Sequence, residues 1–136
     1  MSIYTIPGKL NVEYNNEVKA IIDTWTTYQV SLDEFREAVL VKGMDYAKAH
    51  GAIAWIVDSS KAVGSFNREC QNFIGTDIFP AFAANGIKYF ITINSASALT
   101  NLTVKEYRAK AGPNGLNLVE MPSAAAAIDW LKSNAK

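Results

Sequence analysis

A short and nearly continuous apolar run lies near the middle of the chain, at residues 53–57 (IAWIV). Such a run is typical of a strand that is buried on both faces at the centre of a sheet. Beyond it, segments of helix and strand character alternate to the end of the chain. Because alternating strands and helices form parallel βαβ crossovers, the sequence predicts an α/β fold with a mostly parallel sheet.

The N-terminal part of the chain predicts an antiparallel hairpin. Residues 9–14 and 18–25 alternate and are rich in β-branched and aromatic side chains, as strands are. Asn15 and Asn16 lie between them, and asparagine tolerates the positive φ of a tight turn. Further strands are expected at 53–57, 87–93 and 116–120, and helices at 31–50, 66–85, 100–111 and 123–134. We therefore expect one domain, residues 1–136, with a mixed five-stranded sheet and four helices.

Three residues in the expected helices indicate local structure. Ser31 and Glu34 have the spacing of a capping box, in which each side chain satisfies a free backbone N–H group at the helix start. Gly43 lies inside the first helix, where glycine costs roughly 1 kcal/mol relative to alanine, so a packing role or a local irregularity is expected there. Pro80 interrupts the helix over 66–85 and should kink it or begin its second half.

Composition and charge argue against several classes of protein. The chain has 13 basic and 13 acidic residues, so its formal net charge of zero argues against nucleic-acid binding. No apolar run approaches the ~18–20 residues that span a bilayer, and the first residues lack a signal-peptide pattern. We therefore expect a cytoplasmic protein without membrane insertion. The single cysteine, Cys70, excludes an intrachain disulfide and a cysteine-cluster zinc site. No metal-ligand spacing or Gly-rich phosphate loop stands out, so neither a metal nor a cofactor is expected.

Short motifs spread over residues 18–133 carry a resemblance to a known superfamily. They are DTW at 23–25, SLDEFR at 31–36, WIVD at 55–58, DIFP at 77–80 followed by NGIK at 85–88, and MPS at 121–123 followed by IDWL at 128–131. Their order and spacing resemble the STAS, or anti-sigma-factor-antagonist, superfamily, in its small bacterial SpoIIAA-like branch of unassigned function. The resemblance implies a mixed sheet with an antiparallel edge strand wrapped by βα units. It also implies a regulatory or interaction role rather than catalysis.

The chain departs from this superfamily in the loop after the central strand. STAS proteins that act as phosphorylation switches resemble one another in an Asp-Ser pair that opens the following helix. Here the pair Asp58-Ser59 occurs earlier, at the strand end, and Ser65 is the hydroxyl nearest to the expected position. Ser65 is therefore the candidate phosphoacceptor that the resemblance implies.

The same loop is the strongest candidate for a binding site. It should leave the carboxyl end of one parallel strand beside the loop that leaves the next strand, where ligands of open α/β sheets usually bind. Ser65 could also cap the next helix, whose free N–H groups favour an anion. Serine and asparagine equally fill turns and helix caps in any α/β domain. The candidate binding residues are Asp58, Ser59, Ser60, Ser65, Asn67, Asn94 and Ser95.

No catalytic residue is predicted. The only histidine, His50, falls in the last helical turn before Gly51, at the end of the βα units opposite the candidate loops. Cys70 falls among apolar residues at helical spacing, as a buried and inert thiol does. An enzyme would need Asp58 and a serine to work without help from histidine.

Four phenylalanines in the 66–85 segment have two interpretations. They can pack inside a kinked helix, or they can form an exposed apolar patch for a partner, a homodimer or a hydrophobic ligand. The candidate interaction surface is Phe66, Phe73, Phe79 and Phe82. The function predicted first is a non-enzymatic regulatory or protein-interaction domain that forms a homodimer. The alternative is a protein that binds a small apolar or anionic metabolite at the loops after the central strands.

Overall fold

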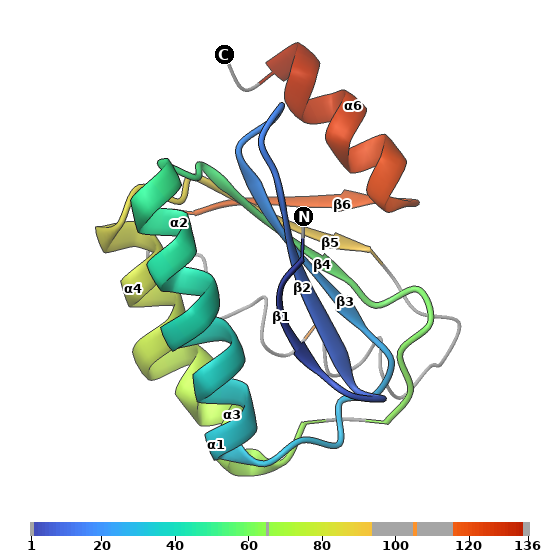
Figure 1. Ribbon diagram of the computed structural model, residues 1–136. Coiled ribbons are helices and arrows are strands. Elements are labelled where there is room, and N and C mark those ends of the chain that lie inside the picture. The colour runs from blue at the N-terminus through green and yellow to red at the C-terminus, as the bar shows by residue number, and fades with distance from the viewer. Residues whose placement is uncertain (1, 65, 94–104, 106–115, 135–136) are drawn as a thin grey trace.

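The protein is built on one mixed six-stranded sheet, seen in the computed structural model in Figure 1. The structure describes residues 2–64, 66–93, 105 and 116–134. The strands lie side by side in chain order, from β1 at one edge to β6 at the other. They are β1 (Ser2–Ile6), β2 (Leu10–Asn15), β3 (Ala20–Trp25), β4 (Ala54–Asp58), β5 (Tyr89–Ile93) and β6 (Asn117–Met121).

The pairing confirms the predicted α/β class, the hairpin and the parallel crossovers. β1, β2 and β3 pair antiparallel, whereas β3, β4, β5 and β6 pair parallel. The expected count of five strands is corrected to six, because β1 precedes the predicted hairpin. Its signal is weak, since the strand has only five residues before the Pro7-Gly8 turn, in which Gly8 adopts a φ of 75°.

The turn between β2 and β3 differs from the expected one. The positive φ falls on Lys19, at 53°, and not on an asparagine. Asn15 contributes through its side chain, whose Oδ1 accepts hydrogen bonds from the backbone N–H groups of Glu17 and Val18. The asparagine therefore stabilises the turn from its edge, as an Asx turn does.

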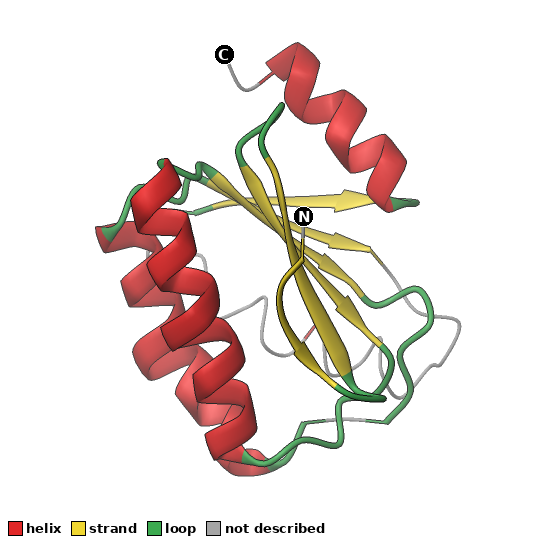
Figure 2. Ribbon diagram, in the orientation of Figure 1, coloured by secondary structure: helices red, strands yellow, loops and turns green. Residues whose placement is uncertain are grey.

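Among the described elements, two helical rods cover one face of the sheet and a single helix lies on the other (Figures 1 and 2). The first rod is α1 (Leu32–Phe35), a π-helical segment (Arg36–Gly43) and α2 (Met44–His50). The second rod is α3 (Arg68–Phe73), a π-helical segment (Ile74–Ile78) and α4 (Phe79–Ala84). The opposite face carries α6 (Ala124–Asn134). The expected helix over 100–111 lies outside the described residues. None of the described helices has the length and apolar character needed to cross a membrane.

The predicted helix signals are confirmed in both rods. Ser31 Oγ accepts from the backbone N–H of Glu34, while the Glu34 carboxylate accepts from the backbone N–H of Ser31, so the capping box is complete. Pro80 stands in the first turn of α4 and so begins the second half of its rod. Gly51 ends the first rod in the left-handed conformation.

Alternate residues of each central strand pack into two separate cores. On β5, Phe90 faces the rods, whereas Ile91 and Ile93 face α6. The core beneath the rods is rich in aromatic side chains, and the core beneath α6 is aliphatic. The sheet therefore separates the molecule into an aromatic layer and an aliphatic layer, and the candidate site lies in the aromatic one.

Candidate functional site

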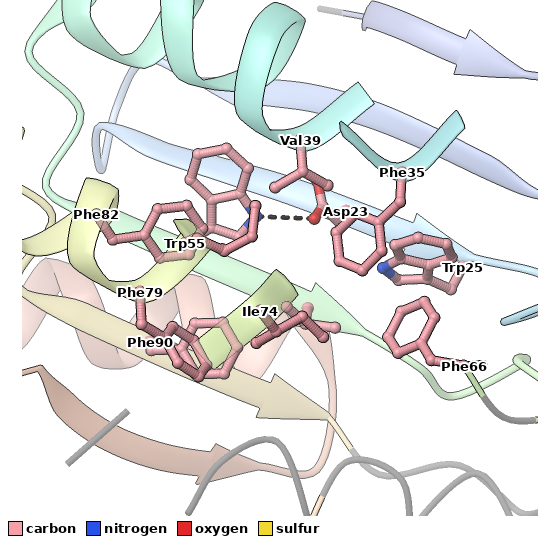
Figure 3. A pocket seen from close by; sticks show the side chains of 12 residues that line it. Asp23, Trp25, Phe35, Val39, Trp55, Phe66, Ile74, Phe79, Phe82 and Phe90 are labelled. Carbon is pink, nitrogen blue, oxygen red and sulfur yellow. Dashed lines mark hydrogen bonds between the residues drawn. The ribbon is translucent and has the colours of Figure 1, made fainter. Parts of the chain in front are cut away.

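A small cavity lies between the sheet and the two rods (Figure 3). The cavity has a volume of about 30 Å³. The described lining is aromatic or aliphatic except for one carboxyl group, that of Asp23. The aromatic lining residues are Trp25, Phe35, Trp55, Phe66, Phe79, Phe82 and Phe90.

Asp23 carries a buried carboxyl group with one free oxygen. The residue lies on β3 and is 2% exposed. The indole Nε1 of Trp55, on the neighbouring strand β4, donates a hydrogen bond of 2.8 Å to Oδ2. Oδ1 has no hydrogen-bond partner in the described part of the chain. An acceptor that is buried without a partner costs about 1–3 kcal/mol, so the site is incomplete as it stands.

Burial dominates the electrostatics of this carboxyl group. Removal from water disfavours the charged form and raises the pKa of Asp23 from 3.8 to about 7. The hydrogen bond from Trp55 acts in the opposite direction, because it favours the carboxylate. Asp23 therefore changes its charge near neutral pH, which an exposed aspartate does not do.

A second buried polar atom, Oγ1 of Thr92, belongs to a residue in register with Asp23 across β3, β4 and β5. Asp23 pairs in register with Val57, and Val57 pairs with Thr92 on β5. Residues in register on parallel strands point to the same face, so Thr92 faces the rods as Asp23 does. Its Oγ1 also lacks a partner among the described residues. Thr92 is not among the residues that line the cavity, so Asp23 supplies the polar group of the site.

Gly43 makes room for the indole that holds Asp23. A Cβ atom at this position would lie 2.8 Å from Cη2 of Trp55 and 3.0 Å from the backbone oxygen of Ala38. Gly43 also ends the π-helical segment of the first rod, so the structure confirms both the packing role and the irregularity predicted for it. Short π-helical segments are frequent at functional sites, and residues of both such segments line this cavity.

Replacing Gly43 with alanine is expected to destabilise the protein by about 1–3 kcal/mol, because the new methyl group overpacks the indole of Trp55. The helix propensity of alanine offsets part of this cost. Urea unfolding checks the value, and the tryptophan emission spectrum reports the shift of Trp55. The exposed change Asp45→Ala in the same rod is the control, expected to stay within about 0.5 kcal/mol of the wild type. A Gly43→Ala protein as stable as the wild type would contradict the close contact.

The predicted binding loop begins at the carboxyl end of β4, and its described candidate residues Asp58, Ser59, Ser60 and Asn67 are not among those that line the cavity. The Asp58 carboxylate accepts from the backbone N–H of Ser60. Ser59 is buried, and its hydroxyl forms a short hydrogen bond with the hydroxyl of Tyr28. Asn67 caps the second rod by accepting from the backbone N–H of Cys70 at 2.8 Å. These contacts belong to turns and a helix cap, and no hydrogen bond joins Asn67 to the Asp58 turn in the described chain. Ser65, Asn94 and Ser95 lie outside the described residues.

The predicted interaction surface is buried within the chain. Phe66, Phe73, Phe79 and Phe82 are between 0% and 8% exposed, and three of them line the cavity. They are therefore corrected from an exposed surface to the packed interior of the rods, which is the first of the two interpretations. The described residues show one exposed large hydrophobic side chain, Val63.

Cys70 and His50, the two residues whose side chains could take part in catalysis, pack against other side chains of the chain. Cys70 is buried, as expected, and burial together with the neighbouring Glu69 raises the pKa of its thiol to about 11. His50 lies in the last turn of α2, where its ring stacks on Tyr46 at 4.0 Å. Within the described chain, no group of three or more histidine, cysteine, aspartate and glutamate side chains could hold a metal ion.

The sequence reasoning missed Asp23 as a site residue, although a signal was present. Ile21, Asp23 and Trp25 share one face of β3, and both apolar neighbours are buried. A carboxylate between two core positions of the same face has to be buried itself. The position of Asp23 in the strand pattern therefore predicts a carboxyl group inside the core.

Comparisons with known proteins give no relative for this chain. No protein-family model matches it, and neither a curated protein nor a solved structure matches it.

Proposed function

We propose that the protein binds a small and largely apolar ligand in the cavity between the sheet and the rods, and that the ligand donates a hydrogen bond to Asp23. The observation that carries this proposal is Oδ1 of Asp23, which is buried in an apolar cavity and lacks a partner among the described residues. A donor from a ligand would recover the hydrogen bond that this oxygen lost when it left water. The aromatic lining supplies apolar surface for the rest of the ligand.

The size of the cavity limits the ligand. The free space of about 30 Å³ holds only one or two water molecules. A ligand with an aromatic ring therefore requires some of the lining side chains to turn aside. Trp55 is held by its hydrogen bond to Asp23. The other lining rings meet in edge and stacking contacts, such as that of Phe79 on Phe90 at 5.0 Å, so these other rings are the ones that turn aside.

A titration with benzyl alcohol tests the proposal, because this probe joins an apolar ring to one neutral donor. Its binding is expected to shift the NMR signal of the Trp55 Nε1–H, which lies on the same carboxyl group as the ligand. The variant Val39→Phe fills the cavity from the first rod and is expected to abolish the shift, while the Trp130 signal on α6 confirms that it is folded. A Trp55 signal that neither benzyl alcohol nor benzylamine moves at millimolar concentration, or equal binding by Val39→Phe, would contradict the proposal.

The STAS-like fold, the regulatory or interaction role, the homodimer and the cytoplasmic location stay predictions beside this proposal. The coarse α/β architecture, with antiparallel strands at one edge and parallel strands beyond them, supports the first. β1 and β6, the edge strands among those described, support the homodimer, because each pairs on one side only. Sedimentation of a single monomeric species at high concentration would refute the homodimer.

A further inference from the structure

We propose that the ligand is a small primary amine, bound as its ammonium ion, and that Asp23 is the residue that selects it. This inference rests on the proposed function and names the chemistry of the ligand in the same cavity. It follows from three properties of the site. They are the charge of the Asp23 carboxylate, which no described lining residue compensates, the aromatic rings around this carboxylate, and the strength of the hydrogen bond that Oδ1 can accept.

The described residues around the cavity supply no cation to Asp23. None of the described residues that line the cavity is a lysine, arginine or histidine. Three described basic side chains, just before β2 and on the first rod, form ion pairs with other carboxylates: Lys9 with Glu34, Arg36 with Asp33, and Lys42 with Glu37. The raised pKa of Asp23 has the same cause, since burial acts on it without a compensating positive charge. Since none of the described lining residues supplies a cation, we assign the cation that neutralises this carboxylate to the ligand.

The rings beside Asp23 favour a cation over a neutral group. Figure 3 shows the carboxyl group between Trp55 on one side and Phe35 and Trp25 on the other. The face of an aromatic ring attracts a cation within about 6 Å. Trp55 presents its Nε1–H edge to the carboxyl group, so Trp25 and Phe35 are the rings left for such a contact. The same aromatic layer already holds one cation at its surface, where the Arg36 guanidinium lies 5.4 Å from the ring centre of Phe73.

An ammonium group also matches the free hydrogen-bonding capacity of the carboxylate. Trp55 occupies Oδ2 and holds the carboxyl group in place, so Oδ1 remains for one further donor. A hydrogen bond between two charged partners is roughly twice as strong as one between neutral groups. A neutral donor such as an alcohol would satisfy Oδ1 but would leave a buried charge uncompensated.

Three probes of nearly equal shape test the inference by calorimetry at pH 8. Benzylamine carries the ammonium group, benzyl alcohol a neutral donor, and ethylbenzene a methyl group in the same place. The wild type is expected to bind benzylamine at least tenfold more tightly than either neutral probe. Asp23→Asn keeps the shape of the side chain and removes its charge, so it is expected to lose the preference for benzylamine, whose ammonium group would be buried there without a counter-charge. Thr92→Val is the matched control, since it changes the unpartnered polar group in register with Asp23 and should keep the preference.

The outcomes separate this inference from the proposed function. Equal binding of benzylamine and benzyl alcohol by the wild type would overturn the amine assignment and leave a neutral ligand in the cavity. A preference for benzylamine that persists in Asp23→Asn would overturn the role of Asp23. Binding of none of the three probes would refute both the inference and the proposed function.

Discussion

The variant Asp23→Asn is expected to gain roughly 4 kcal/mol of stability relative to the wild type as the pH rises from 4 to 8. The buried carboxyl group has a pKa of about 7 when the protein is folded, and an unfolded aspartate has a pKa of 3.8. Between these values the folded state holds a proton that the unfolded state has released. Wild-type stability therefore falls as the pH rises from about 4 to about 7, and asparagine, which does not titrate, removes this loss.

Urea unfolding of both proteins at half-unit pH steps measures the effect. Thr92→Val serves as the control, because it removes a buried hydroxyl that does not titrate. This variant is expected to be more stable than the wild type by about 1 kcal/mol at every pH. If the curves of wild type and Asp23→Asn run parallel, the carboxyl group ionises equally easily in both states, and its burial without a charge partner is refuted.

Replacing Trp55 with phenylalanine is expected to destabilise the protein by about 3–4 kcal/mol at pH 8. The indole is fully buried, it stacks on Phe82, and its Nε1 provides the hydrogen bond that the Asp23 carboxylate receives. Its loss leaves a buried charge without any partner in the described chain. At pH 5 the Asp23 carboxyl group is neutral, so the destabilisation is expected to be smaller there.

The matched control is Trp25→Phe, which makes the same change of side chain in the same cavity without touching the hydrogen bond to Asp23. Its cost is expected to be the same at pH 5 and pH 8. The double variant Trp55→Phe with Asp23→Asn should be less destabilised at pH 8 than the sum of the single changes, because one partner of the pair is then already absent. A cost of Trp55→Phe that does not depend on pH would show that the hydrogen bond has no part in holding the carboxylate.

Local sequence signals predicted the strands and helices well where one physical cause dominates. The apolar run at 53–57 became the buried strand β4, and the capping box at Ser31 begins the first rod. β1 was missed because a five-residue strand at a sheet edge has few apolar contacts to leave a pattern. The only sequence signal of the described π-helical segments was Gly43. A glycine is required there by the indole of Trp55, which lies twelve positions further along the chain.

The candidate site was harder to predict because it is made by tertiary packing. The polar loop residues were conspicuous, yet Ser59 and Asn67 satisfy their hydrogen bonds within the chain. Asp23 stood in a motif that carried the family resemblance, but a sequence does not show that Trp55 reaches only one of its two oxygens. The pattern shows that an acid lies on an apolar face, and only the structure shows which atom remains free.

The pKa of the Asp23 carboxyl group, followed by carbon-13 NMR of its side-chain carbon, tests the central claim most directly. The account predicts a value near 7 in the free protein, because the group is buried and no described residue places a cation in the cavity beside it. It further predicts that the pKa falls when benzylamine saturates the cavity, since an adjacent ammonium group favours the carboxylate. A value near 4 in the free protein, or a value that benzylamine binding leaves unchanged, would contradict it.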